Sequence, residues 1–397
     1  MTILCLASYE KGHDFIRECK RQGATVLVVT SLSLKDNHHF PMESIDEIFF
    51  MPDTDRTWDR TDLFKSVSYL ARHREIDRIV ALDDFDVEVA AALREHLRVP
   101  GMGDSTVRFF RDKLAMRMKA REAGIPVPEF VHALNHGRLQ RFMDRVPPPW
   151  VLKPRSMAGA IGIKKIQSQD EFWPILESLG DMQSHYLLEQ FVPGDVFHVD
   201  TIMVDGKPEF AIASSYGRPP MEVAHMGDVF TTRILERDSA IARGLTATNS
   251  QVLSALGLWR GVSHTEFIAG RGDGTIYFLE TSARVGGAHI AELVEAASGL
   301  NLWAEWAKLE LQPGYHVTPP REDYAGLLVS LSKQQHPDTS AYTDPEIVWR
   351  MDDKEHHVGL IVHSPSAPRV KELLGSYTER VKRDFWLYLP PQEKPTH

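Results

Sequence analysis

Two glutamates on neighbouring predicted strands have the spacing that points most directly to chemistry. The stretch HTEFIAGRGDGTIYFLETSAR begins at residue 264 and predicts a hairpin centred on Asp273. Symmetric pairing about that turn places Glu266 opposite Glu280 and His264 opposite Ser282. All four share one face, because side chains alternate along a strand. Opposed carboxylates repel each other, so this face predicts a cation between them.

Magnesium is the cation that such a pair would select, because it binds few carboxylates and takes its other ligands from phosphates and water. In the same register Phe278 and Ile268 share the face of the glutamates, while Phe267 and Leu279 cover the other face. These apolar neighbours are not those of a solvated surface. Two glutamates that point to water remain the alternative, and a one-residue slip of the register would separate the pair.

Arg284 follows the second glutamate by four residues, in ARVGGAHI. A guanidinium at this distance could bind a phosphoryl oxygen or a substrate carboxylate through two parallel hydrogen bonds. The Gly286-Gly287 pair would let the backbone approach a ligand closely. A surface salt bridge is the alternative role for this arginine.

A lysine and a glycine-rich loop stand earlier, in WVLKPRSMAGAIGIKKI, which begins at residue 150. The order GxxxxGK[ST] of a Walker A loop is absent. Lys153 instead ends a strand, and the loop that follows could fold over phosphates with backbone N–H donors. A hairpin with a loose tip is the alternative. A Mg²⁺ site calls for phosphates, so we expect Lys153 to bind phosphate and Ser156 to Gly162 to form a mobile lid, ordered when nucleotide is bound.

The elements that must position these residues begin with an alternating region. In the first hundred residues strands and helices follow each other, which predicts a parallel sheet with helical crossovers. No GxGxxG follows the first strand, so a dinucleotide site is disfavoured. The predicted strands are 3–7, 24–30 and 79–82, and the predicted helices are 13–22, 63–73 and 87–96.

Strand signals dominate the centre of the chain. Asp104 or Ser105 can cap a helix that runs to Gly124, and Asp205-Gly206 is a strong hairpin turn. The last 80 residues indicate a small α+β unit, with strands near 324–330 and 358–363. The other predicted strands are 150–153, 186–191, 197–204, 209–214, 262–268 and 276–281, and the other helices are 169–178, 240–256 and 288–297.

Composition bounds the class of protein. With 397 residues, two or three domains are expected. A net charge of −10 argues against a nucleic-acid partner. Cys5 and Cys19 are the only cysteines, and neither a secretory signal nor an 18-residue apolar run is present. These features predict a reduced, cytoplasmic protein without a membrane span.

The order of the motifs, from about Val107 to Leu311, resembles the ATP-grasp superfamily. Members use two lysines that bind phosphate, an E-x-x-[VIL] hinge that holds adenine, and a metal signature of E on one strand and E-x-N-x-R on the next. The matching residues here are Lys113 and Lys153, Glu189 and Val192 in EQFV, Glu266, and Glu280, Ser282 and Arg284 in ETSAR. On its own, Lys113 in FRDKLAMRMK reads as an ordinary solvated lysine.

Two positions depart from the family pattern. The third metal ligand, normally asparagine, is Ser282, whose hydroxyl is a weaker ligand than an amide oxygen. The acid that binds ribose is replaced by Val196, and neighbouring Asp195 is the candidate substitute. Ser156 and Gly159 are the candidate phosphate contacts in the loop.

The resemblance implies an α/β and α+β multidomain fold. A parallel, Rossmann-like pre-ATP-grasp domain (1–105) would precede a two-lobed ATP-grasp fold with antiparallel sheets. Its small lobe (106–185) would carry the phosphate loop, and its core (186–315) the adenine and metal sites. A small C-terminal α+β unit (316–397) would close the site, as in dipeptide-forming ligases.

The resemblance also implies a carbon–nitrogen ligase that uses ATP and Mg²⁺ or Mn²⁺. It would activate a small carboxylate as an acyl phosphate, which an amine, here expected to be an amino acid, then attacks. The segment ARVGGAHIAELVEAASGLNL is most similar to amino-acid ligases and biotin-carboxylase-like members rather than D-alanine ligases. Arg284 would bind the acyl phosphate or the substrate carboxylate. Separately, the segment from Tyr216 to Phe230 lies between predicted strands, so His225 is a candidate to contact substrate or act as a base, with an ordinary polar loop histidine as the alternative.

Two other functions stay open at this point. One is a carboxylase of the biotin or purine type, although no A-M-K-M biotin-attachment motif is present. The other is a regulatory protein that binds nucleotide without turnover, which the departures at Ser282 and Val196 favour. Family members are often dimers, so a homodimer is a further expectation of the resemblance.

Overall fold

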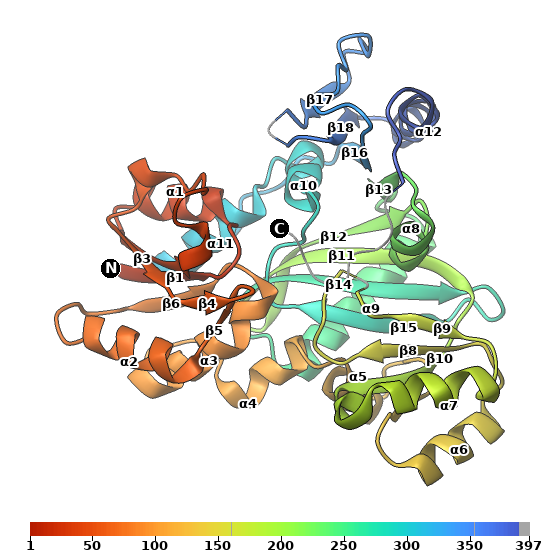
Figure 1. Ribbon diagram of the computed structural model, residues 1–397. Coiled ribbons are helices and arrows are strands. Elements are labelled where there is room, and N and C mark those ends of the chain that lie inside the picture. Colours follow the sequence, from red (N-terminus) through yellow and green to blue (C-terminus); the bar gives the residue numbers. More distant parts are fainter. Residues whose placement is uncertain (160, 353, 389–397) are drawn as a thin grey trace.

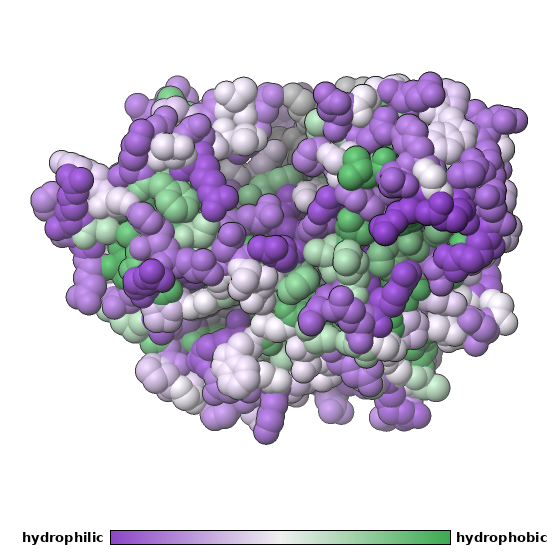
Figure 2. All heavy atoms as spheres, turned by 90° about the horizontal axis from the view of Figure 1, so that it is seen from below, coloured by the Kyte–Doolittle hydropathy of each residue, from purple (hydrophilic) through white to green (hydrophobic). Residues whose placement is uncertain are grey.

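The computed structural model describes residues 1–159, 161–352 and 354–388, with the side chains of 224–226 excepted (Figure 1). Its fold is mixed α/β, with an N-terminal parallel sheet followed by antiparallel sheets, as the sequence predicts. The described helices include none with both the length and the apolar character that a membrane crossing needs. The face in Figure 2 is mostly hydrophilic, with apolar side chains in separate groups.

The N-terminal sheet has the order β3-β2-β1-β6 and all its strands are parallel. The central strand TILCLA is buried almost throughout, as expected for a strand covered by helices on both faces. The sequence does not predict the edge strand β3, because EIFFM shows no alternation of polar and apolar residues. In the structure most of its residues are half-buried. The elements are β1 (Thr2–Ala7), α1 (His13–Arg21), β2 (Thr25–Ser31), β3 (Glu47–Met51), the short pair β4 (Asp53–Thr54) and β5 (Thr57–Trp58), α2 (Arg60–Leu70), β6 (Arg78–Ala81) and α3 (Val87–Leu97).

The predicted helix from Asp104 to Gly124 is wrong, because the chain breaks before Lys113. It forms α4 (Asp104–Val107), a short 3-10 turn and then α5 (Lys113–Glu122). Asp112 caps α5, and its Oδ1 accepts a hydrogen bond from the amide of Leu114 at 2.9 Å. The break places Lys113 in the first turn of α5, with its side chain free to turn toward the neighbouring sheets.

A second, four-stranded antiparallel sheet contains the strand that carries Lys153. Its order is β7-β10-β8-β9, and α6 and α7 lie on one side of it (Figure 1). The aromatic and aliphatic side chains of those helices pack on the buried Trp150. The elements are β7 (Phe130–His132), α6 (His136–Arg145), β8 (Trp150–Pro154), β9 (Lys164–Ile166), α7 (Gln169–Ser178) and β10 (Tyr186–Gln190).

The third sheet is the largest, with the order β15-β14-β11-β12-β13-β16-β18-β17, and its paired strands are antiparallel. The strands of the predicted C-terminal unit do not form a sheet of their own, since β16 pairs with β13 and extends this sheet. The domain boundaries themselves stay predictions. The strands are β11 (Gly194–Val204), β12 (Lys207–Tyr216), β13 (Phe230–Ile234), β14 (Gly261–Gly270), β15 (Ile276–Ser282), β16 (Tyr324–Leu331), β17 (Ile347–Arg350) and β18 (His357–Ser364).

Helices join the N-terminal sheet to the large sheet through a shared core. Residues of β1 and α1 belong to the same apolar cluster as residues of β11, α10 and α11. Within it, the rings of Phe15 and Trp306 meet edge to face at 5.2 Å. This packing fixes the carboxyl ends of β1 and β6 close to the end of β15. The remaining helices are α8 (Pro220–Met226), α9 (Ala240–Leu256), α10 (Ile290–Ser298), α11 (Leu302–Leu311) and α12 (Ala367–Asp384).

Candidate active site

The glutamate pair lies at the predicted register. Glu266 on β14 is the cross-strand partner of Glu280 on β15, and His264 is the partner of Ser282. Both glutamates and Ser282 line a cavity of about 380 Å³. Side chains from β6–α3, α5, the loop after β8 and the segment before α10 complete its wall.

The prediction for the apolar neighbours of the pair is partly wrong. The register shifts between Glu266 and Phe267, so Phe267 pairs with Phe278 instead of Leu279. Phe278 therefore packs against Phe267 in the core, and Leu279 joins the cluster of Ile268. Such a bulge adds one residue to one strand and reverses the alternation beyond it.

Lys113 connects three parts of the cavity. Its Nζ forms an ion pair with Glu280 Oε2 at 2.7 Å and donates a hydrogen bond to the carbonyl oxygen of Met157 at 2.6 Å. The lysine is buried, so water does not screen the pair well. Lys113 thus links α5, the metal-type carboxylate on β15 and the loop after β8.

Lys153 belongs to a buried group of three charges. It forms an ion pair with Glu189 on β10, whose Oε2 also accepts from Arg117 Nε at 3.1 Å. Burial lowers the pKa of Lys153 to about 8, against the opposing field of Glu189. Burial opposes ionisation of Glu189 too, but Arg117 and Lys153 hold its pKa below the ordinary value. Glu189, the carboxylate expected near adenine, is therefore paired with two cations.

Arg117 is a residue that sequence reasoning missed. Its side chain is fully buried, and besides Glu189 it donates to the backbone carbonyl of Leu279. Arg117 follows Lys113 by one helical turn in KLAMR, so both project from the same face of α5. That spacing is the signal that could have found it.

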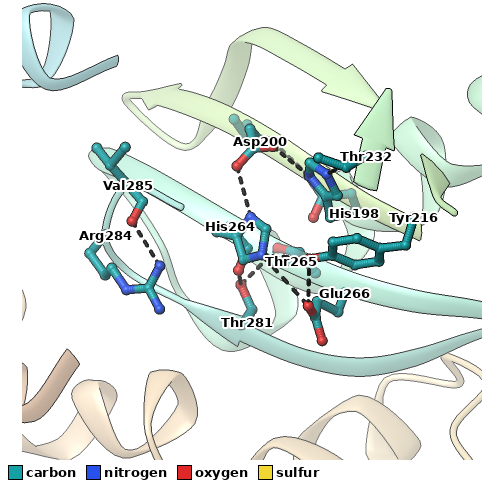
Figure 3. Close-up of polar contacts among 12 residues, drawn as sticks. His198, Asp200, Tyr216, Thr232, His264, Thr265, Glu266, Thr281, Arg284 and Val285 are labelled. Carbon is teal, nitrogen blue, oxygen red and sulfur yellow. Dashed lines mark hydrogen bonds and ion pairs between the residues drawn. The ribbon is translucent and has the colours of Figure 1, made fainter. Parts of the chain in front are cut away.

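Arg284 lies in the cavity wall, paired with a carboxylate from the N-terminal sheet. Its Nε donates to Asp84 Oδ2 at 2.9 Å. Its Nη1 donates to the carbonyl of Val285 at 2.8 Å, as Figure 3 shows. Although burial opposes ionisation of Asp84, Arg284 holds its pKa well below the usual range. The salt bridge that was the alternative role for Arg284 is thus present but largely buried, and it joins the end of β15 to the turn after β6.

A second set of polar side chains lies behind Glu266, and sequence reasoning missed it (Figure 3). Both oxygens of the buried Asp200 accept hydrogen bonds from imidazoles, at 2.7 Å from His198 Nδ1 and 2.9 Å from His264 Nδ1. Burial would lower the pKa of His264, but Asp200 outweighs it and raises the pKa to about 9. Burial lowers the pKa of His198.

The same three residues have the types and closeness that could hold a metal ion, since their ligand atoms lie within 4.8 Å of one another. The hydrogen bonds argue against it. Both Asp200 oxygens already accept imidazole protons, and His198 Nε2 lies 2.8 Å from the hydroxyl of Thr232. A metal ion could bind here only by breaking these buried hydrogen bonds.

Several predicted residues do not line the cavity, among them Lys153, Glu189 and Val192. Asp195 is exposed and pairs with Arg271 at 3.0 Å, because alternation along β11 turns it away and turns Val196 inward. Ser156 is not among the residues that line the cavity, whereas Gly159 is. The side chain of His225, in α8, lies outside the described part of the structure.

The loop after β8 has the predicted backbone character. Gly159 and Gly162 both have a positive φ, at 68° and 73°. A side chain at Gly162 would also come within 2.9 Å of Pro154. Met157, Ala158, Gly159 and Ile161 line the cavity, and residue 160 lies outside the described residues. The predicted lid therefore borders the site, and its mobility stays a prediction.

Val192 packs next to the cavity wall through a cluster that includes the cavity residue Tyr216. It packs on a small cluster of Val196, Tyr216 and Ile268, together with Leu279. A flat apolar ligand surface would suit this cluster. The adenine role of Val192 stays a prediction.

Part of the chain is similar to a known domain family. Residues 146–292 match the model of an ATP-grasp domain. An L-arginine-specific L-amino acid ligase of Bacillus subtilis is 24% identical over 251 residues, covering 61% of this chain and 60% of that protein. A D-alanine–D-alanine ligase of Neisseria gonorrhoeae is 23% identical over 208 residues, covering 51% of this chain and 66% of that protein. The chain therefore spans less than two thirds of the length of both curated relatives.

A solved structure matches over nearly the whole chain. The crystal structure of an L-amino acid ligase from Bacillus licheniformis superposes with a TM-score of 0.74 at 17% identity, covering 98% of each chain. At that identity the likeness shows a shared fold. The domain match, the ligase relatives and this fold together identify residues 146–292 as an ATP-grasp domain, as the order of the sequence motifs predicts.

Proposed function

We propose that the chain is a carbon–nitrogen ligase that activates a small carboxylate with ATP and joins it to an amine, with an amino acid as one partner. The observation that carries this proposal is a single cavity lined by Glu266, Glu280, Lys113, Arg284 and the loop after β8. The relatives whose names specify amino acid ligases support the same reaction class. ADP and phosphate would be the other products.

Mg²⁺ or Mn²⁺ fits the donor set of the cavity. Glu280 is about one third exposed, and Glu266 Oε2 has no hydrogen-bond partner among the described residues. Glu266 and Glu280 would hold the metal, with the Ser282 hydroxyl beside them. When bound, the metal supplies neutralisation of phosphate charge and polarises a phosphoryl oxygen.

The lysines would bind the phosphates of ATP. Lys113 contacts Glu280 and Met157. With metal and nucleotide bound, Glu280 would contact the metal in place of Lys113, and Lys113 would contact a phosphate oxygen in place of these partners. Lys153 would contribute its ammonium from beside Glu189. Backbone N–H groups near Ser156 and Gly159 would add donors, and the closed loop would keep water from a hydrolysable acyl phosphate.

Arg284 would bind the acyl phosphate or the substrate carboxylate, since its guanidinium borders the cavity and can donate to two oxygens at once. Glu189 and Val192 would border adenine. His225 would contact substrate or act as a base. Asp195 is left out of the proposal, because its side chain points away from the cavity.

The test is phosphate release with ATP, Mg²⁺ and a matrix of amino-acid pairs. We expect release with at least one pair, and its loss in Glu280→Ala. Glu122→Ala is the matched control, because Glu122 is an exposed glutamate on α5. ATP binding without phosphate release for any pair would contradict the ligase and support a regulatory protein. Release that depends on bicarbonate would support a carboxylase.

A further inference from the structure

A row of buried polar side chains runs across neighbouring strands to Glu266 (Figure 3). The Thr232 hydroxyl lies 2.8 Å from His198 Nε2, and His198 Nδ1 donates to Asp200 at 2.7 Å. His264 Nδ1 donates to the other oxygen of Asp200 at 2.9 Å, and His264 Nε2 lies 3.8 Å from Glu266 Oε1. The row therefore ends at one oxygen of a carboxylate in the cavity.

A tyrosine reaches the same oxygen from another strand. The hydroxyl of Tyr216, at the end of β12, donates to Glu266 Oε1 at 2.7 Å. Its ring is held by His198 at 4.8 Å and by Phe230 at 5.6 Å. Oε1 thus accepts the Tyr216 hydrogen bond and has the His264 ring nitrogen nearby, whereas Oε2 has no hydrogen-bond partner within the described ranges.

This arrangement is costly for a purely structural role. Asp200 and His198 are fully buried, and a buried ionised carboxylate costs free energy even when it is hydrogen-bonded. Apolar side chains of similar volume would often stabilise such a position as well or better. The polar residues instead fix orientation, because each hydrogen bond restricts the side-chain rotation of the next residue in the row toward Glu266.

We propose that Tyr216 and His264 are positioning residues that fix Glu266 through Oε1 and so present Oε2 to the metal. Asp200 sets the orientation of His264, and His198 supports Asp200 from the other side. Partners behind a metal ligand act in this way generally, by reducing the freedom that the ligand would lose on binding. The inference rests on the proposed function, since it requires a metal at Glu266 and Glu280.

The test compares nucleotide binding with and without Mg²⁺. Isothermal titration of ADP would be measured in Mg²⁺ and in EDTA for the wild type and Tyr216→Phe, which keeps the ring and removes one hydroxyl. We expect the gain in affinity that Mg²⁺ gives to fall about 10- to 100-fold. The affinity in EDTA should stay within about twofold, because Oε1 would not contact the nucleotide itself.

The matched control is Tyr377→Phe. Tyr377 is also buried and its hydroxyl donates to Asp344, but it lies on α12 and packs in a separate apolar cluster. Both of its affinities should equal those of the wild type. A structural role for Tyr216 would lower both affinities or neither, since the folded fraction enters both measurements equally.

His264→Gln provides a second variant, because His264 contacts Glu266 from β14 whereas Tyr216 contacts it from β12. The same loss of the Mg²⁺-dependent gain in affinity is expected. A wild type that gains no affinity from Mg²⁺ would overturn the proposed function and with it the inference. A wild type with a clear gain, retained in full by both variants, would overturn the inference alone and leave the ligase proposal standing.

Discussion

Replacing Glu189 by glutamine should make nucleotide binding strongly dependent on pH. Glu189 lies between the buried cations Lys153 and Arg117, and its field is the largest influence that keeps Lys153 protonated. With Glu189 present, burial already lowers the pKa of Lys153 to about 8. In Glu189→Gln the burial and the repulsion from Arg117 are opposed only by the more weakly acting Glu280, so the pKa falls further.

The expected loss follows from the fraction of ammonium. At pH 8 about half of the wild-type Lys153 side chains are charged. Once the pKa lies below the pH, each further unit by which the pKa falls reduces the charged fraction about tenfold. ADP·Mg²⁺ affinity at pH 8 should therefore drop about tenfold or more in Glu189→Gln and recover toward pH 6. Isothermal titration from pH 6 to 9 measures this directly.

A control variant isolates the lysine. Lys153→Arg in the Glu189→Gln background keeps a positive charge at every pH in the range, since arginine does not deprotonate there. Its affinity should be almost independent of pH. If Glu189→Gln follows the wild-type profile across the whole range, Glu189 does not sustain the charge of Lys153 and the reasoning is refuted.

The same ionisation bears on stability. The folded-state pKa of Lys153 lies below its ordinary value, so the unfolded chain binds more protons between about pH 8 and 10.5. The contribution of Lys153 to the free energy of unfolding is therefore lowest below pH 8 and increases as the pH rises through that window. Leaving the two cations without Glu189 should cost about 3–5 kcal/mol at most, and less where Lys153 can lose its proton.

Three further outcomes are expected. Lys113→Met removes the contacts to Glu280 and Met157, so trypsin should cut the loop after β8 faster than in the wild type; an unchanged rate would mean that Lys113 does not hold the loop. Asp195→Asn should change stability by less than about 1 kcal/mol and leave ADP affinity unaltered, because its carboxylate forms an exposed ion pair; a tenfold weaker affinity would restore its ribose role. Asp200→Asn should lower the unfolding free energy by about 3 kcal/mol in urea titration, since it removes the charge that two imidazoles share, and a change below 1 kcal/mol would contradict this.

The glutamate pair could be predicted because a hairpin is a local structure. A strong turn and a period of two fix which residues oppose each other, and the register at Glu266 and Glu280 is confirmed. The bulge next to Glu266 could not be predicted, since nothing in FLE distinguishes a paired residue from an inserted one. It moved Phe278 to the core and left the glutamates in place.

The break before Lys113 shows a different limit. The run from Asp104 to Gly124 has helical composition throughout, and only a tertiary contact decides that it breaks. Asp112 caps α5, while Arg155, directly after β8, donates to the Asp112 carboxylate. The two lysines are thus placed by one interaction between segments about 40 residues apart, which local preferences do not encode.

The row behind Glu266 was beyond sequence reasoning for a topological reason. His198 and Asp200 lie on β11, His264 on β14 and Tyr216 on β12, and β11 lies between the other two strands in the sheet. The pairing of Asp200 with His264 joins residues 64 positions apart. Read singly, each residue has a common alternative, a satisfied core histidine or a strand tyrosine. Only the strand order shows that the alternating polar residues of FHVDT and of SHTEF lie on the same face of the sheet. A search for metal sites in related chains should therefore examine the strands next to the metal carboxylate as well as its own hairpin.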